Sequence, residues 1–339
     1  MATIHDVAKA SGVSVTTVSV VLNNAPRPVN AETRQRVLAA ARRLNYHPNA
    51  MARGLVSRRT HSLGIQFSSV EPSVVTNYYA SGILSGILAE GAMRKYDIHL
   101  FTSLWENATV SGSRIKAQRT DGVLAISPVI GSDIASGLEQ ANLPVVVVSA
   151  PSGLPNVPYV DVDNILGARL AVEHLLELGH TRIAYLATDR TMHSEREREA
   201  GFLTGMQEAG RSVAPEFVVS TSYVLGDITQ SLARLLALPA PPTALFVCND
   251  NIALSLLKAA RDLNVSIPGT LSLIGFDDTD LASLSAPALT TIRHPLRDIG
   301  ATAARLLIER IEGRAVPERH IFTPELVVRA STAPPPHRT

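Results

Sequence analysis

The chain of 339 residues is longer than a single hydrophobic core usually serves, so we expect two or three domains. It is 45% hydrophobic and 18% charged with a net charge of +1, which excludes a disordered or fibrous protein. Its single cysteine, Cys248, excludes an internal disulfide and a cluster of thiolate metal ligands, and it is typical of a reducing compartment.

Charge is distributed unevenly along the chain. Residues 1–60 contain nine basic and two acidic side chains, a net charge of +7, whereas the other 279 residues contain 22 basic and 28 acidic side chains, a net charge of −6. A small basic head on an acidic body is typical of a nucleic-acid-binding module, although a solvated basic surface would give the same total. The near-neutral total therefore does not exclude a nucleic-acid partner.

Apolar residues at helical spacing predict three short helices in the head, over Ile4–Ala10, Val15–Leu22 and Ala31–Leu44. Each helix follows a residue whose side chain can cap its N-terminus, namely Thr3, Ser14 and Asn30. Gly12 lies in the tight connection between the first two helices and can adopt a positive φ. This pattern is typical of a helix-turn-helix, whose second helix enters the major groove of DNA. The outward positions expected on that helix are all small: Val15, Thr16, Thr17, Ser19 and Val20.

The segment TIHDVAKASGVSVTTVS at residues 3–19 closely resembles the head of the LacI/GalR family of bacterial transcription regulators. The motifs LNYHPN at residues 44–49 and ARGL at residues 52–55 match as well. The resemblance implies that Val15, Thr16 and Val20 face base edges, and that Thr17 and Ser19 hold phosphates. Many family members carry arginine or histidine at the position of Val20. A valine can pack against a thymine methyl, or it extends the inward face of the helix and contacts no base.

A further short helix is predicted over Ala50–Val56, where Gly54 makes it marginal on its own. The resemblance implies a hinge helix that folds on DNA and lies in the minor groove beside that of the second subunit. It assigns Leu55 as the apolar wedge at the central base step, with Arg53 among the DNA-binding residues. The alternative is a linker leucine that packs on the body.

After Ser62 the chain alternates apolar runs with amphipathic stretches, which predicts an α/β body of two lobes with parallel sheets. Strands are predicted over Leu63–Phe67, Ile98–Thr102, Gly122–Ser127, Val145–Ser149, Tyr159–Val162, Arg182–Ala187, Phe217–Ser220, Ala244–Cys248 and Leu271–Phe276. Helices are predicted over Ser81–Lys95, Leu166–Leu178, Arg198–Ala209, Asn251–Leu263 and Ile299–Ile311. Gly82 and Gly86 have the spacing of a close helix-packing motif.

The family resemblance continues through the body in RTDG at 119–122, VDN at 162–164, REAGF at 198–202, ND at 249–250 and LIGFDD at 273–278. It implies a fold like that of periplasmic sugar-binding proteins: two Rossmann-like lobes, three crossings and a ligand cleft between the lobes. The expected division is a helix-turn-helix domain at 1–46, a hinge and linker at 47–61, and an effector-binding and dimerisation domain at 62–339. Within the last, lobe 1 covers about 62–160 and 292–320, and lobe 2 about 161–291 and 321–339.

Several polar residues follow predicted strands, where open α/β sheets bind ligands. The resemblance implies seven effector contacts: Tyr79, Asp163, Ser194, Arg198, Tyr223, Asp250 and Asp277. Arg198 is the strongest candidate, because its motif is intact and its planar guanidinium can clamp a carboxylate or a pair of hydroxyls.

Some of these residues have structural alternatives. Asp250 is equally suited to cap the helix that begins at Asn251, and Asp163 to a structural role. Asp278 and Asp280 are expected to be solvated or to cap helices. Many family members have Asp-Arg after the strand at 145–148, where this chain has Ser-Ala, so the chemical class of the effector stays open.

The sequence contains no catalytic or metal-binding motif, so we expect no enzymatic activity, cofactor or metal. The prediction is a dimeric repressor that binds a pseudo-palindromic operator in double-stranded DNA under allosteric control by a small-molecule effector, a sugar or related metabolite. A transporter's solute-binding protein is an alternative that the +7 head opposes, and a Rossmann-like enzyme is another. The N-terminus has no apolar run and no stretch is typical of a membrane span, which favours the cytoplasm and no membrane partner.

Overall fold

A computed structural model of the chain describes residues 2–22, 27–46, 59–67, 77–117, 120–188 and 190–336. The chain forms two compact units, Met1–Thr60 and His61–Thr339. The predicted hinge helix, and with it Arg53 and Leu55, lies outside the described residues. Within the described ranges, no helix is both long and apolar enough to cross a membrane.

The first unit is a head of three helices: α1 Ile4–Ser11, α2 Val15–Leu22 and α3 Ala31–Arg43. All three predicted caps are present, since Thr3, Ser14 and Asn30 each accept a hydrogen bond from the backbone N–H three residues further on. Gly12 has a φ of 66°, the left-handed conformation expected of it. A small apolar core that includes one valine from each helix, Val7, Val18 and Val37, holds the unit together. These features confirm the helix-turn-helix prediction.

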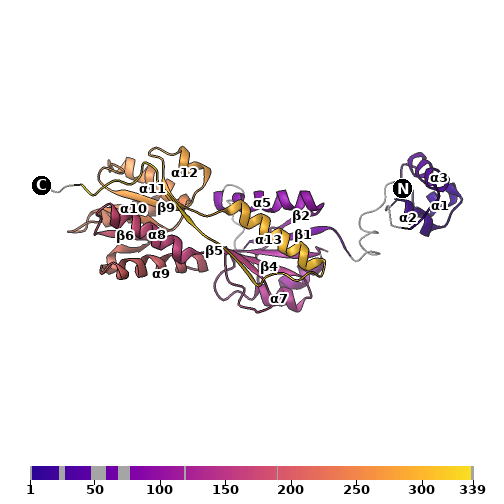
Figure 1. Ribbon diagram of the computed structural model, residues 1–339, viewed down its shortest axis with the longest axis horizontal. Helices are drawn as coiled ribbons and strands as arrows, with labels where there is room; N and C mark the ends of the chain where they lie inside the picture. The colour runs from indigo at the N-terminus through magenta and orange to yellow at the C-terminus, as the bar shows by residue number, and fades with distance from the viewer. Residues whose placement is uncertain are drawn as a thin grey trace. The chain divides into compact units, whose positions relative to one another are not determined.

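The second unit contains two six-stranded sheets (Figure 1). Lobe 1 is built on the sheet ordered β11-β5-β4-β3-β1-β2, with strands β1 Ser62–Phe67, β2 Asp97–Phe101, β3 Gly122–Ile126, β4 Val145–Val148, β5 Tyr159–Val162 and β11 Arg319–Phe322. Lobe 2 is built on the sheet ordered β12-β10-β9-β8-β6-β7, with strands β6 Ile183–Ala187, β7 Val218–Ser220, β8 Ala244–Val247, β9 Ser272–Asp277, β10 Thr290–Arg293 and β12 Glu325–Val327. Strand pairs are parallel except that β12 runs antiparallel to β10.

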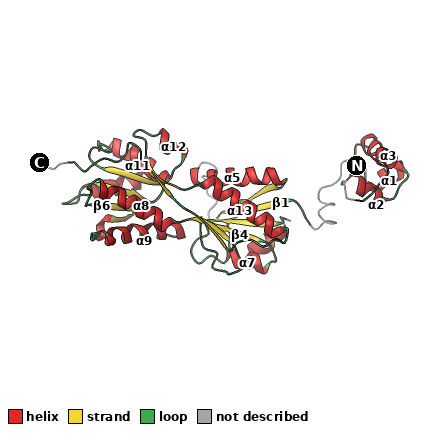
Figure 2. Ribbon diagram, viewed as in Figure 1, coloured by secondary structure: helices red, strands yellow, loops and turns green. Residues whose placement is uncertain are grey.

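Helices cover the faces of both sheets (Figure 2). Those of lobe 1 are α5 Tyr78–Arg94, the π-helix η2 Ala108–Gly112, α6 Ser113–Ala117, α7 Ile134–Gln140 and α13 Leu296–Ile311. Those of lobe 2 are α8 Asn164–Glu177, α9 His193–Glu208, the 3₁₀-helix η3 Pro215–Phe217, α10 Leu225–Leu236, α11 Asp250–Asp262 and α12 Asp280–Leu284. In β3, Leu124 and Ile126 join the core under α5 and α13, whereas Val123 and Ala125 join the core under α7. A continuous apolar run fits this strand because both of its faces are buried.

Helices α5 and α13 pack closely on lobe 1. A Cβ atom built on Gly86 would lie 1.9 Å from the backbone oxygen of Arg297, and one on Gly300 would lie 2.1 Å from the backbone oxygen of Ile83. Only glycine permits backbones to approach so closely. The predicted role of Gly86 in helix packing is therefore confirmed.

The chain crosses between the lobes three times, after β5, after β10 and after β11. These strands end at Val162, Arg293 and Phe322, each two residues beyond the approximate boundary expected from the sequence. Strands β10, β11 and β12 were not among those expected. Each is only three or four residues long, so none presents an apolar run.

Candidate functional site

The outward face of α2 is the candidate DNA-binding surface. Thr16 is exposed, and Thr17 and Ser19 are half-buried. Val15 is also half-buried and packs against the core of the head. Val20 is only 9% exposed, so the expectation that it is an exposed position is wrong. Successive helix residues are about 100° apart, which places Val20 opposite the inward residues Val18 and Leu22, and Val20 is not part of the apolar core of the head. Helix geometry therefore does not support the alternative that Val20 extends the inward face.

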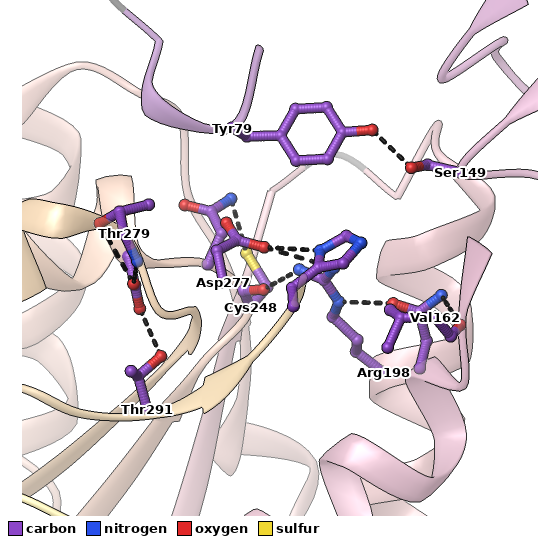
Figure 3. Close-up of polar contacts among 12 residues, drawn as sticks. Tyr79, Ser149, Val162, Arg198, Cys248, Asp277, Thr279 and Thr291 are labelled. Atoms are coloured by element: carbon purple, nitrogen blue, oxygen red, sulfur yellow. Dashed lines mark hydrogen bonds and ion pairs between the residues drawn. The ribbon is translucent and has the colours of Figure 1, made fainter. Parts of the chain in front are cut away.

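Tyr79, in the first turn of α5, is the centre of a polar site in lobe 1. Its hydroxyl lies 2.8 Å from Oγ of Ser127. The same hydroxyl donates to Oγ of Ser149 at 2.6 Å (Figure 3). Ser127 and Ser149 directly follow β3 and β4 with φ values of 46° and 58°, a left-handed backbone that non-glycine residues rarely adopt. Such conformations gather at binding sites. Burial raises the pKa of Tyr79 to about 12, so its hydroxyl stays protonated.

Arg198, on α9, is the centre of the site in lobe 2 and is only 4% exposed. Its Nε donates to Oδ1 of Asn164 at 2.9 Å, and its Nη1 donates to the backbone oxygen of Cys248 at 2.6 Å. Its Nη2 lies 3.6 Å from Oδ1 of Asp277, and its Cζ lies 3.6 Å from the centre of the Phe276 ring. The buried guanidinium thus has polar partners along its edge (Figure 3) and an aromatic ring on one face.

Asp277 ends β9, and His294 follows the neighbouring strand β10. Nδ1 of His294 lies 3.1 Å from Oδ1 of Asp277. Burial lowers the pKa of His294, so its ring is neutral at pH 7 and Nδ1–H donates to the carboxylate. The rings of His294 and Tyr79 have centroids 5.8 Å apart, which brings the two polar sites together. We call the joined set the interlobe cluster: Tyr79, Ser127, Ser149, Asn164, Arg198, Asp277 and His294.

Asp161, inside β5, borders the interlobe cluster and was not a predicted site residue. Its Oδ1 accepts from the backbone N–H of Val162 at 2.8 Å and lies 3.5 Å from Nδ2 of Asn164. The same Asn164 nitrogen donates to Oε2 of Glu197 at 3.0 Å. Burial raises the pKa of Asp161 to about 7, and the charge of Glu197 adds to the effect.

Asp250 is fully buried at the start of α11. The alternative that Asp250 caps this helix is wrong, because the capping side chain is that of Asn249. Asp250 instead accepts from the backbone N–H of Thr279 at 2.9 Å and from the hydroxyl of Thr291 at 2.6 Å (Figure 3). Burial, followed by the charge of Asp277, raises its pKa to about 7. Asp250 therefore joins the segment after β9 to strand β10.

Three predicted effector contacts lie apart. Asp163 is exposed and caps α8 by accepting from the backbone N–H of Leu166 at 2.9 Å, which is the structural alternative. Ser194 is half-buried in the first turn of α9. Tyr223 is 58% exposed, and its hydroxyl accepts from Nδ2 of Asn249 at 3.1 Å. Among the contacts of the described residues, none joins Asp163, Ser194 or Tyr223 to the interlobe cluster.

Asp278 differs from its expected role. It was expected to be solvated or to cap a helix, but it forms ion pairs with Nε of Arg293 at 2.9 Å and with Nη2 of Arg329 at 2.5 Å. Arg293 ends β10 and Arg329 follows β12, so both lie far from Asp278 in the sequence, and the residues next to Asp278 do not indicate these ion pairs. Asp280 is exposed at the start of α12, as expected. Cys248 is a buried free thiol.

Some residues of the site carried a detectable signal and some did not. Ser127 and Ser149 end predicted strands, which is the signal that marked Asp277. His294 follows β10, a strand that the sequence did not indicate. Asp161 lies inside β5 and does not follow the end of a strand, so the criterion that identified Asp277 could not identify it.

The lobes also touch outside the interlobe cluster. A single antiparallel bridge joins Val129 of lobe 1 to Met192 of lobe 2. Nδ2 of Asn251 donates to Oδ1 of Asn77 at 3.3 Å. These contacts and the interlobe cluster hold the lobes in the arrangement seen here.

Comparison with known proteins covers almost the whole chain. Residues 3–49 match the family model described as bacterial regulatory proteins, lacI family, and residues 172–332 match that of a periplasmic binding protein-like domain. The chain is 34% identical over 343 residues to the HTH-type transcriptional regulator DegA of Bacillus subtilis, with 98% of each chain covered. It is 31% identical over 328 residues to catabolite control protein A of Priestia megaterium, with 96% of this chain and 97% of that one covered.

Solved structures agree with the sequence comparison. A lac repressor dimer bound to operator and the anti-inducer ONPF matches with a TM-score of 0.86 and 28% identity, over 98% of this chain and 99% of that one. A complex of the transcriptional regulator CelR with cellobiose matches with a TM-score of 0.74 and 29% identity, over 98% of this chain and 100% of that one.

Proposed function

The chain belongs to the LacI family of bacterial regulatory proteins, and we propose that it is a repressor that binds a pseudo-palindromic operator as a homodimer under the control of a small-molecule effector. The family consists of transcription regulators, so the chain is a DNA-binding regulator and not an enzyme. One observation carries the proposal: a single chain joins a basic helix-turn-helix head to two lobes that enclose a buried polar cluster. Because it acts on DNA, we place it in the cytoplasm.

For the head, we propose that residues 1–46 bind the major groove and that residues 47–61 form the hinge. The proposed DNA contacts are Val15, Thr16, Thr17 and Ser19 of α2, with Arg53 and Leu55 of the hinge. The exposure of Thr16 and the net charge of +7 over residues 1–60 support this assignment. The burial of Val20 weighs against a base contact there.

For the body, we propose that residues 62–339 bind the effector and form the dimer. Tyr79, Arg198 and Asp277 are the proposed effector contacts in the interlobe cluster. Asp250 was also an expected contact, but it is fully buried and bound to Thr279 and Thr291, so we propose a structural role for it. Asp163, Ser194 and Tyr223 are proposed on the family resemblance alone.

Selection of DNA from a random pool by the full-length protein tests the DNA-binding role. We expect an enriched site with approximate twofold symmetry, and an affinity that falls steeply with salt because several phosphates are neutralised. Thr16→Glu, which adds a negative charge to the outward face of α2, should weaken binding by more than 10-fold, on the order of one lost base or phosphate contact. Gln207→Glu adds the same charge at an exposed position of the body and should leave binding unchanged. Equal DNA binding by both variants would contradict the assignment of α2 as the DNA-binding helix.

Leu55→Ala tests the hinge role. An apolar wedge strengthens DNA binding only where the central base step is unstacked. The variant should therefore lose affinity for the selected site and keep its affinity for random DNA. Fluorescence anisotropy with both DNAs measures the two affinities. Equal losses for both would show that Leu55 acts as an ordinary linker residue.

A further inference from the structure

The interlobe cluster and its border contain more acid than base. Asp161, Asp250 and Asp277 are each at most 3% exposed, whereas Arg198 is the cation buried among them. Glu197 is half-buried and shares the Asn164 amide with Asp161. In the part of the chain that the structure describes, no ion pair includes Asp161, Asp250 or Glu197. The site therefore offers acceptors whose negative charge is only partly balanced.

Arg198 is not available to hold an anion. Its Nε is bound to Asn164, its Nη1 to a backbone oxygen and its Nη2 to Asp277, while Phe276 covers one face of the guanidinium. An incoming carboxylate or phosphate would have to replace Asp277 and then lie beside the displaced carboxylate. Such a juxtaposition of like charges is strongly unfavourable in a buried site.

Three other arginines of lobe 2 are already paired with carboxylates, and Nε of Arg196 on α9 donates to the backbone oxygen of Arg190. Arg190 pairs with Glu199 at 2.6 Å, and Arg293 and Arg329 pair with Asp278 at 2.9 and 2.5 Å. None of these three guanidiniums is left to neutralise an anionic ligand at the interlobe cluster.

His294 supplies an independent indication of what the ligand carries. Its side chain is fully buried, and its neutral ring uses Nδ1–H to bind Asp277. Its Nε2 is then a hydrogen-bond acceptor, and this atom has no partner among the described residues. An acceptor buried without a donor costs free energy, and a ligand N–H or O–H at this point would remove that cost.

We propose that the effector is a small polyhydroxylated molecule without negative charge, which donates hydrogen bonds to Asp161, Asp277 and Nε2 of His294, and that an amine is preferred to a hydroxyl beside Asp161. The proposal rests on the proposed function of the interlobe cluster as the effector site. An ammonium group would face Asp161 and Glu197, two carboxylates that now share a single amide donor. Burial and the charge of Glu197 raise the pKa of Asp161 to about 7, and the positive charge of an ammonium group would lower it toward its ordinary value.

Thermal-shift titration of the full-length protein at pH 8 tests the proposal with matched probes. These are glucose, glucosamine and glucuronate; galactose, galactosamine and galacturonate; ribose and ribose 5-phosphate; and adenosine and adenosine monophosphate. We expect a neutral or amine-bearing member to raise the Tm, and its anionic counterpart to bind at least 10-fold more weakly. The proposal is overturned if an anionic member binds more tightly than its neutral parent, or if no neutral or amine-bearing probe binds.

The preference for an amine is tested with the variant Asp161→Asn and the control variant Asp262→Asn. Asp161→Asn should reduce the preference for the amine over its neutral parent by about 10-fold, because it removes one buried charge. Asp262 is an exposed carboxylate paired with Lys258, and Asp262→Asn should leave the preference unchanged. An unchanged preference in Asp161→Asn would exclude its carboxylate from the site.

Operator affinity distinguishes this proposal from the proposed function. If an anionic probe binds and changes operator affinity, effector control stands and the charge selectivity proposed here fails. If bound probes never change operator affinity, effector control itself fails. The affinity of the protein for its selected DNA is therefore measured with each probe that shifts the Tm.

Discussion

Removal of the buried charge at position 161 has a calculable effect on stability. Asp161 is 3% exposed within β5, and its pKa is raised from an ordinary 3.8 to about 7, first by burial and then by Glu197. A carboxyl whose pKa rises on folding contributes stability that is full below pH 3.8 and lost as the pH rises through about 7. Asp161→Asn keeps the shape and an acceptor oxygen for Val162 but removes the charge.

The magnitude follows from the same values. Between pH 5 and pH 7 the carboxyl is ionised in the unfolded chain but stays mostly protonated in the folded one, so folding must take up a proton, and each pH unit costs about 1.4 kcal/mol. The variant should therefore gain about 3 kcal/mol relative to the native chain between pH 5 and pH 8. A constant offset of about 1–3 kcal/mol arises if the introduced amide lacks a partner, and it does not change with pH. Asp250 and His294 titrate in both proteins, so their effects cancel in the difference.

Urea denaturation followed by the fluorescence of Trp105 measures this difference. Trp105 is the single tryptophan of the chain and packs against the core of lobe 1, whose sheet contains β5. Free energies of unfolding for both proteins are compared at pH 5, 6, 7 and 8, with Asp262→Asn as the exposed control. A difference that stays constant within about 0.5 kcal/mol across this range would refute the reasoning, because it would mean that folding does not perturb the carboxyl.

Two further predictions concern packing and lobe contact. Gly86→Ala should lower the unfolding free energy by about 3 kcal/mol, because its new Cβ would lie 1.9 Å from a backbone oxygen of α13. Gly226→Ala, whose Cβ would meet nothing within 4 Å, should not lower it, and equal losses in thermal unfolding would contradict the close packing of α5 and α13. Cysteines introduced together at Val129 and Met192 should form a disulfide on mild oxidation, since bridge partners lie at suitable separation. Titration of free thiols measures the bond, and thiols that persist in the double variant as in the single ones would show that this lobe contact is absent in solution.

Local interactions explain which parts of the fold could be predicted from the sequence. The caps at Thr3, Ser14 and Asn30 were predictable because a capping side chain bonds to backbone three residues away. The central strands were predictable because strands buried on both faces are continuous apolar runs. The edge strand β12 has neither property, since its three residues depend on pairing with β10.

The site was less predictable because its chemistry arises from tertiary contacts. Asp161 differs from an ordinary strand residue only through its burial beside Glu197, which comes from another helix, α9. His294 becomes an acceptor facing the cluster only once β10 lies beside β9. Asp278 was misjudged for the same reason, since its two arginine partners lie 15 and 51 residues away.

In the proposed function, the position of the interlobe cluster links the charge of the ligand to the affinity for DNA. Tyr79 holds the ends of β3 and β4 in lobe 1, while Arg198 and Asp277 belong to lobe 2, so a ligand between them changes the balance of contacts across the lobes. Lobe 1 begins with β1 at Ser62, so in the proposed dimer the arrangement of this lobe in each subunit would set where the two proposed hinges start. A ligand shifts this equilibrium only by the difference in its affinity for the two lobe arrangements, and bound DNA changes the ligand affinity by the same factor. Because Asp161 lies at the first crossing between the lobes, a ligand ammonium there would be stabilised only in arrangements that keep Asp161 and Glu197 together. Charge selectivity and allosteric control would then depend on the same pair of carboxylates.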